Sequence, residues 1–160
     1  MTPAEVCAVP AGRPHVVVAV AHRAMRSLIV DLLDRDRDHD HDHGRGRWVV
    51  SAVDSMSELG DAALSNPDLV IVDTADFAGC CCHLPPSFAL DRIVVIGPEP
   101  DPAYRQAALN RGAGGWLSRE CVAEELCDAL CSALVCSQRG GPRCNDLQNR
   151  PHPAQERPSC

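Results

Sequence analysis

A single carboxylate, Asp73, directly follows a short and wholly apolar segment, residues 69–72. β-Branched apolar residues in a run of this length are typical of a buried strand in a parallel sheet. Folds with such sheets bind their ligands at the carboxyl ends of the strands, which is where Asp73 would lie. A carboxylate in that position can accept a phosphoryl group if a metal ion and nearby cations neutralise the charge. Asp73 is therefore the first candidate functional residue.

The composition of the 160 residues argues against several classes of protein. No apolar run approaches the roughly 18 residues of a membrane span, and residues 1–14 lack the pattern of a signal peptide, which favours a cytoplasmic protein without membrane contact. The net charge is −7, and a negative surface disfavours direct nucleic acid binding. Neither a nucleophile–base pair nor a glycine-rich phosphate loop is recognisable, so we do not expect an enzyme.

A charged segment, residues 34–47, offers an alternative chemistry. His39, His41 and His43 alternate there with aspartates, a composition that can bind zinc or nickel weakly. Binding would cost a flexible loop conformational entropy, and nothing in the pattern determines its geometry. We therefore favour a solvated insertion and keep a weak metal site as the alternative.

The chain contains ten cysteines, and no two of them have the CxxC spacing of zinc or redox motifs. Cys127 and Cys131 are four residues apart on a predicted helix, so one metal ion could contact both. Burial as small apolar side chains is the simpler interpretation. The triplet Cys80-Cys81-Cys82 is suited to oxidation more than to chelation, because adjacent side chains point apart.

Strands are predicted at residues 16–20, 48–53, 69–72, 92–96 and 116–117, and helices at 22–33, 57–64, 102–111 and 122–135. The third helix, within residues 74–91, should be short or irregular because that segment contains two adjacent prolines. This alternation predicts an α/β fold with a doubly wound, five-stranded parallel sheet in the order 2-1-3-4-5. Residues 14–137 would form the domain, residues 1–13 an extension and residues 138–160 a disordered tail.

Three segments resemble response-regulator receiver domains: residues 17–22, residues 67–73, and residues 109–117 with the sequence LNRGAGGWL. With Glu124-Glu125-Leu126 in the last helix, the similarity is closest to the subgroup usually joined to a helix-turn-helix DNA-binding domain. The resemblance covers roughly residues 14–137. It implies a flavodoxin-like fold in which a histidine kinase phosphorylates an aspartate, here Asp73, with the help of bound magnesium.

The residues that would assist the phosphoacceptor depart from the family pattern. Val20 and Ala21 replace the acidic pair that binds magnesium, and neither offers a side-chain oxygen. Gly97 replaces the threonine or serine at the end of the fourth strand. Arg119 replaces the lysine that follows the fifth strand, in a chain with no lysine at all, and a planar guanidinium is not equivalent to an ammonium group. Trp116 occupies the position of a smaller aromatic residue.

We therefore expect magnesium binding to be weak or lost, no other cofactor, and a fixed ion pair between Asp73 and Arg119 that imitates one signalling state. The leading hypothesis is an atypical receiver-like domain of a two-component system. It would act through contacts with a regulatory protein or a histidine kinase, and could form a homodimer through its last helix. One alternative is a transcription-regulator receiver module truncated of its DNA-binding domain and still phosphorylated at Asp73. Another is a metal- or redox-responsive protein that uses the histidine–aspartate segment or the cysteines.

Overall fold

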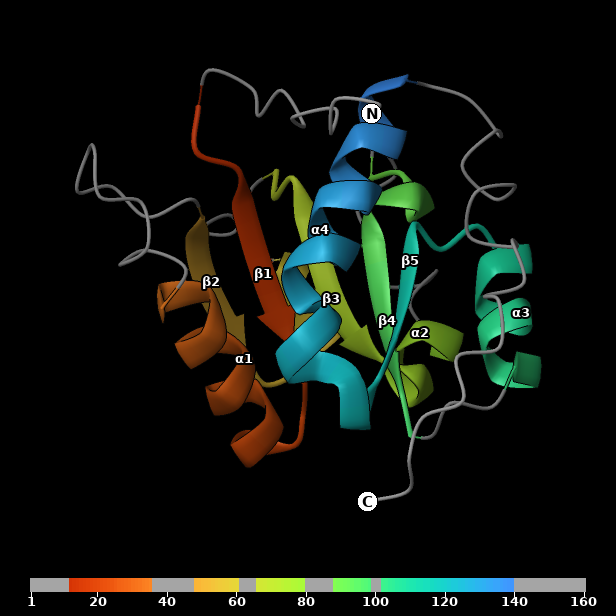
Figure 1. The fold of residues 1–160 in the computed structure, drawn as a ribbon, viewed down its shortest axis with the longest axis horizontal. Helices are drawn as coiled ribbons and strands as arrows, with labels where there is room; N and C mark the ends of the chain where they lie inside the picture. Colours follow the sequence, from red (N-terminus) through yellow and green to blue (C-terminus); the bar gives the residue numbers. More distant parts are fainter. Residues whose placement is uncertain (1–11, 36–47, 61–65, 80–87, 99–101, 140–160) are drawn as a thin grey trace, which may run out of the picture.

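Five parallel strands form one sheet in the order β2-β1-β3-β4-β5 (Figure 1). The structure is a computed structural model and describes residues 12–35, 48–60, 66–79, 88–98 and 102–139. The strands are β1 (His15–Ala19), β2 (Val49–Val53), β3 (Leu69–Asp73), β4 (Ile93–Gly97) and β5 (Gly115–Ser118). The fold class and strand order predicted from the sequence are therefore confirmed.

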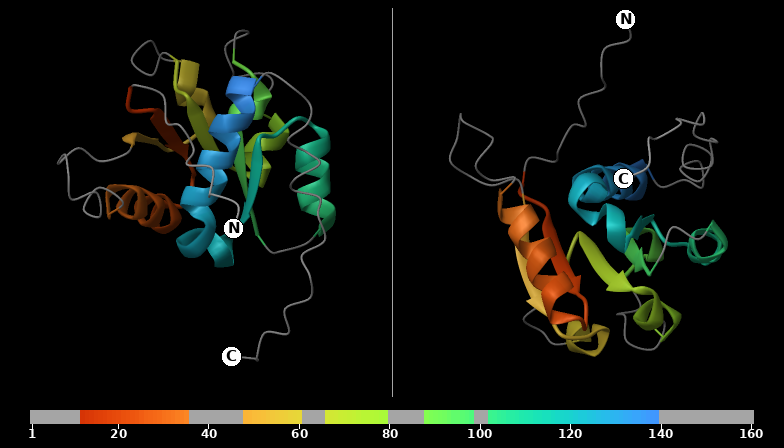
Figure 2. Two further views of the ribbon diagram at one scale, coloured as in Figure 1. Left: turned by 45° about the horizontal axis from the view of Figure 1, so that its top comes forward. Right: turned by 60° about the horizontal axis from the view of Figure 1, so that its bottom comes forward.

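Helices and short helical turns alternate with the strands. They are α1 (Arg23–Arg35), η1 (Met56–Gly60), α2 (Thr74–Gly79), η4 (Leu90–Arg92), α3 (Pro102–Asn110), η5 (Arg119–Cys121) and α4 (Val122–Arg139). Seen from two further sides, the helices lie on both faces of the sheet (Figure 2). Because both faces are covered, the central strands are apolar at almost every position, as parallel sheets require. None of the helices within the described residues is long and apolar enough to cross a membrane.

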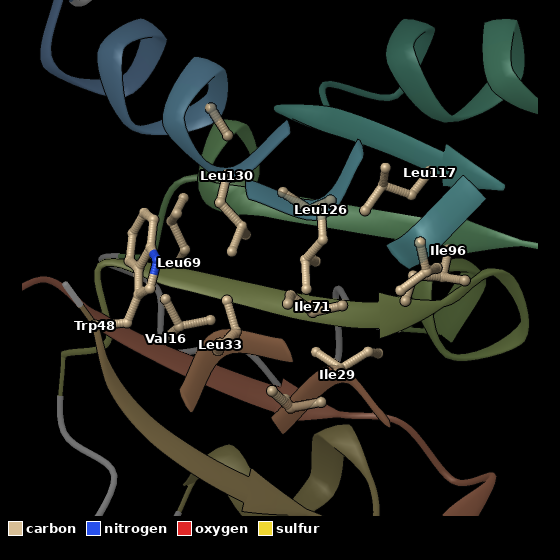
Figure 3. Packing of buried hydrophobic residues seen from close by; sticks show 14 of the residues in the cluster. Val16, Ile29, Leu33, Trp48, Leu69, Ile71, Ile96, Leu117, Leu126 and Leu130 are labelled. Carbon is tan, nitrogen blue, oxygen red and sulfur yellow. The ribbon is translucent and has the colours of Figure 1, made fainter. Parts of the chain in front are cut away.

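One face of the sheet is covered by α1 and α4. Ile29 of α1 and Leu126 and Leu130 of α4 are almost completely buried, and they pack on strand residues such as Ile71 (Figure 3). The spacing of four residues between the two leucines places them on the same side of α4. This packing holds the start of α4, and η5 before it, against the sheet.

The other face is covered by η1, α2 and α3. Met56 of η1, Phe77 of α2 and Ala108 of α3 pack with the strand residues Val70 and Val95. Successive strand residues alternate between the two clusters because side chains in a strand point to opposite faces. Because all five strands are parallel, their carboxyl ends meet at one edge, and that edge contains the candidate site.

Some boundaries differ from the prediction. α1 continues to Arg35, two residues into the predicted loop, where a basic side chain in the last turn favours a helix. The helix predicted at residues 57–64 begins as the 3-10 helix η1, and its described part ends at Gly60.

Other predicted features agree with the structure. The third helix, α2, is short as predicted, with six residues. Gly112 has φ 103°, the left-handed conformation expected of the residue that ends α3. α4 runs past the predicted domain end at residue 137, while the insertion from residue 36 and the tail from residue 140 lie outside the described residues.

Candidate functional site

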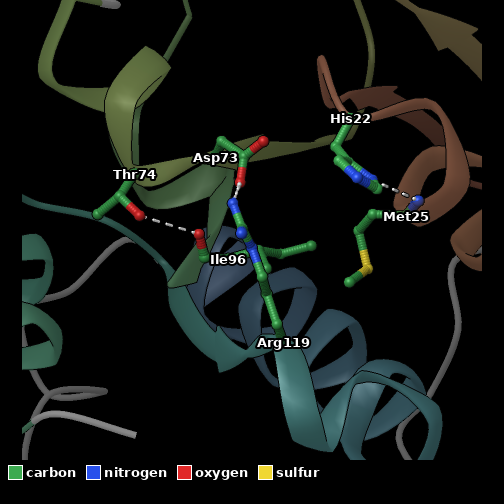
Figure 4. Close-up of polar contacts among 6 residues, drawn as sticks. All are labelled: His22, Met25, Asp73, Thr74, Ile96 and Arg119. Carbon is green, nitrogen blue, oxygen red and sulfur yellow. Dashed lines mark hydrogen bonds and ion pairs between the residues drawn. The ribbon is translucent and has the colours of Figure 1, made fainter. Parts of the chain in front are cut away.

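Asp73 is the last residue of β3, and only 8% of its surface is exposed. Its Oδ1 accepts a hydrogen bond from Nη2 of Arg119 at 3.0 Å, and the two charges form an ion pair (Figure 4). The Arg119 side chain is 43% exposed, so the pair lies at the border between the core and solvent. The predicted contact between these two side chains is thus present in the structure.

The end of β1 has no acidic side chain, and an arginine lies there instead. Nη1 of Arg26, from the first turn of α1, donates hydrogen bonds to the carbonyl oxygens of Val20 at 2.7 Å and Ala21 at 3.4 Å. Its Nη2 forms an ion pair with Asp54, which follows β2, at 2.6 Å. Where the family pattern has a metal ion bound by carboxylates, this chain therefore has the guanidinium group of Arg26, bound by two carbonyl oxygens and by Asp54. Arg26 was not among the residues predicted from the sequence, although its place in the first turn of the helix after β1 is a usable signal.

Gly97 and Trp116, two separate departures from the family pattern, prove to be in contact. Gly97 ends β4 opposite Ser118 of β5, and Trp116 lies opposite Val95. The indole ring covers the side of Gly97 from which a side chain would project. A Cβ atom placed there would overlap Cζ2 and Cη2 of the ring, and even Cε2 would be only 2.9 Å away. A threonine or serine at position 97 is therefore incompatible with this position of Trp116.

Two hydroxyl groups lie near the strand ends, and neither was predicted from the sequence. Oγ1 of Thr74, the residue after Asp73, donates a hydrogen bond to the carbonyl oxygen of Ile96 at 3.1 Å (Figure 4). Ser118 is buried beside Gly97, and its Oγ has no hydrogen-bond partner among the described residues. Both residues flank predicted site positions directly, which is the signal that could have identified them.

A second carboxylate, Asp76, lies in the first turn of α2, three residues after Asp73. Burial of the carboxyl group raises the pKa of Asp76, and the negative charge of Asp73 raises it further. Its Oδ2 is buried and accepts no hydrogen bond among the described residues. The site therefore contains two carboxylates, of which only Asp73 is compensated by a described cation.

The residues at the end of β1 do not fit magnesium. Magnesium requires nearly octahedral oxygen coordination and is usually held by one or two carboxylates. Val20 and Ala21 supply no carboxylate, and one oxygen of Asp73 is engaged by Arg119. Within the described residues, no three His, Cys, Asp or Glu side chains are arranged to hold a metal ion.

The remaining candidates contribute little to this edge. His22 is exposed, and its Nδ1 accepts a hydrogen bond from the backbone N–H of Met25 at 3.3 Å, which caps the start of α1 (Figure 4). Cys127 and Cys131 are both partly buried on α4, and Cys131 packs against the core. The predicted weak metal site at His39, His41 and His43 and the cysteine triplet at residues 80–82 lie outside the described residues.

The sequence matches no protein family model, and no curated protein matches it either. Solved structures do match. A response regulator receiver domain protein from Clostridium thermocellum is 17% identical with a TM-score of 0.57, over 79% of this chain and 98% of that one. The CpaE2 pilus assembly protein from Sinorhizobium meliloti is 15% identical with a TM-score of 0.55, over 74% and 98%. The RcsB response regulator from Salmonella typhimurium is 16% identical with a TM-score of 0.53, over 84% and 66%. The chain thus has the fold of response-regulator receiver domains.

Proposed function

We propose that this chain is a receiver-like signalling module of a two-component system that acts through protein–protein contacts and is phosphorylated weakly or not at all. The observation that supports this most directly is the ion pair of Asp73 with Arg119. The guanidinium group of Arg119 already neutralises the carboxylate of Asp73, which would have to attack a phosphoryl group. The module would be cytoplasmic and not an enzyme.

The surroundings of Asp73 support the loss of phosphorylation on chemical grounds. Phosphoryl transfer depends on positioned cations, and the metal ion supplies much of the charge neutralisation. Arg26 places its guanidinium at the end of β1, where Val20 and Ala21 provide only carbonyl oxygens. A second positive charge, not a site for a divalent cation, therefore stands at this edge. Weak or absent magnesium binding is accordingly part of the proposal.

The proposed partner is a regulatory protein or a histidine kinase, and a second copy of the chain could pair through α4. The described part of α4 exposes Glu124, Glu125 and Ala123 around its first turn. This surface is acidic, so its binding to a basic partner should weaken as salt screens the charges, whereas the pairing of two identical acidic surfaces should strengthen. Sedimentation of the purified chain at low and high salt would measure the homodimer directly.

The decisive experiment is phosphorylation of the purified full chain by acetyl phosphate, with and without magnesium, followed by intact mass measurement. We expect no more than a small labelled fraction, with little dependence on magnesium. The Asp73→Asn variant is the matched control for labelling elsewhere in the chain. Stoichiometric, magnesium-dependent labelling that disappears in this variant would refute the proposal. It would support the alternative, a transcription-regulator receiver module phosphorylated at Asp73.

A further inference from the structure

The contact between Trp116 and Gly97 is a fit of shapes across two neighbouring strands. Trp116 is partly buried and packs against the apolar cluster that lies under α2 and α3. Its ring fills the space beside Gly97 that any other residue at that position would need for its own side chain. The two residues therefore exclude other combinations: a larger residue 97 requires that the ring move.

Three contacts join the ends of β3, β4 and β5. Arg119 holds Asp73, the Thr74 hydroxyl holds the Ile96 carbonyl group, and Trp116 covers Gly97. The first two are polar and depend on charge or on a hydroxyl group. The third is apolar and depends only on volume. A change of charge at Asp73 alters the first contact directly but leaves the space beside residue 97 as it is.

We propose that Trp116 and Gly97 form a steric lock, which holds the ends of β4 and β5 in one arrangement whatever the charge of Asp73. This inference extends the proposed function, because it explains why such a module would present one constant surface to its partner. If the ring left its place, it would expose apolar surface and leave a void beside a residue that has no side chain to fill it. Rearrangement at this edge is therefore opposed by packing.

The arrangement of β5 allows the ion pair of Arg119 with Asp73 to change without changing the contact of Trp116 with Gly97. Arg119 comes three residues after Trp116, beyond the end of β5 and in the turn η5. Its long side chain is 43% exposed, so it can change position when its partner changes without displacing the strand. The lock thus separates the chemistry of Asp73 from the packing of Trp116.

Fluorine NMR of the full chain labelled with 5-fluorotryptophan tests this inference. The chain has two tryptophans, and the variant Trp116→Phe assigns their two resonances. We expect Asp73→Asn to leave the Trp116 resonance within its linewidth. We expect Gly97→Ser to shift that resonance. We also expect it to increase the change in chemical shift of that resonance between H2O and D2O. A shift of the Trp116 resonance in Asp73→Asn, or none in Gly97→Ser, would overturn the lock.

A matched glycine provides the control for position 97. Gly115 on the adjacent β5 is also buried, but a Cβ atom there would lie 3.4 Å from Cγ2 of Val94, an ordinary contact. Gly115→Ala should therefore leave the Trp116 resonance where it is. A displacement as large as that of Gly97→Ser would show that any added methyl group disturbs this region, and would contradict a lock specific to Gly97.

A double variant keeps the test valid if Gly97→Ser does not fold. Trp116→Ala removes the ring with which the new side chain collides. The substitution Gly97→Ser should then lower the folding equilibrium constant at least tenfold less in the Trp116→Ala background than in the wild-type background. Equal effects in both backgrounds would overturn the lock.

The two proposals fail separately. Labelling of Asp73 with an unmoved Trp116 resonance would refute the proposed function and leave the lock intact. An unlabelled Asp73 with a Trp116 resonance that moves in Asp73→Asn would do the reverse.

Discussion

Arg119 reaches Asp73 across an intervening strand: its Nη2 lies 3.0 Å from Oδ1 of Asp73, although β4 separates β3 from the end of β5. The pair consequently ties together two strands that share no backbone hydrogen bonds. Asp73 is mostly buried, so loss of its partner would leave a carboxylate with little access to solvent. Such groups are expensive to leave uncompensated.

Arg119→Gln should therefore lower the free energy of unfolding by about 1–3 kcal/mol, the usual range for a buried polar group left without its partner. Urea denaturation at neutral pH measures this. The matched control is the double variant with Asp73→Asn, in which neither charge remains. If the pair matters, the double variant should be more stable than the sum of the two single effects implies. Simple additivity would show that the two side chains do not interact in solution.

Arg26 should contribute more to stability than its ion pair alone. Arg26→Gln removes the hydrogen bonds to the carbonyl groups of Val20 and Ala21 as well as the contact with Asp54. Asp54→Asn removes only the ion pair, and the Asp54 side chain is 76% exposed, so its loss should cost no more than about 1 kcal/mol. Urea denaturation of both variants should show the larger loss in Arg26→Gln. Equal losses would show that the carbonyl contacts are unimportant.

Gly114 should tolerate no side chain. A Cβ atom at this position would collide with the backbone oxygen of Asp91, and the N–H of Gly114 is held by the carbonyl of Ile93 at 2.9 Å. Since backbone atoms cannot swing aside, Gly114→Ala should destabilise the fold by at least the roughly 1–3 kcal/mol typical of overpacking. Gly12→Ala is the control, because a Cβ atom there has no neighbour within 4 Å. Thermal unfolding that treats the two variants alike would contradict this geometry.

The stability of the protein should depend on pH through Asp76. The fold raises the pKa of Asp76 above its ordinary 3.8, through burial first and the charge of Asp73 second. The folded state therefore binds this proton more tightly than the unfolded state, and stability is lost as pH rises from 3.8 through the raised pKa. At neutral pH, Asp76→Asn should be more stable than the wild type by about a few tenths of a kcal/mol, the size of solvent-screened charge effects.

Urea denaturation of wild type and Asp76→Asn at a series of pH values measures this difference. It should shrink as the pH falls and vanish below the ordinary pKa of aspartate. A difference that stays constant with pH would indicate a packing effect of the substitution and not a titration.

Local patterns in the sequence were sufficient for the secondary structure and for the sheet. The apolar runs around Val17, Ile71 and Val94 differ in period from the helix of Leu126 and Leu130, and this difference depends only on near neighbours. Right-handed crossovers then leave few possible strand orders. The placement of Asp73 at a strand end follows from the same reasoning, and so does its proximity to Arg119, since parallel strands end at a common edge.

The contacts of Gly97 and Arg26 could not be read from the sequence. Position 97 is merely a missing hydroxyl group until the packing of β4 beside β5 brings the Trp116 ring over it. Arg26 is one of fifteen arginines until α1 folds back against β1 and turns its guanidinium toward the carbonyl groups after that strand. These contacts depend on side-chain positions across elements distant in the sequence.

The sequence by itself thus determined the strands, the helices and the position of Asp73 at the end of a strand, through periodicities a few residues long. Only the tertiary structure decided what surrounds Asp73, because packing and burial depend on volumes and charges brought together from separate parts of the chain.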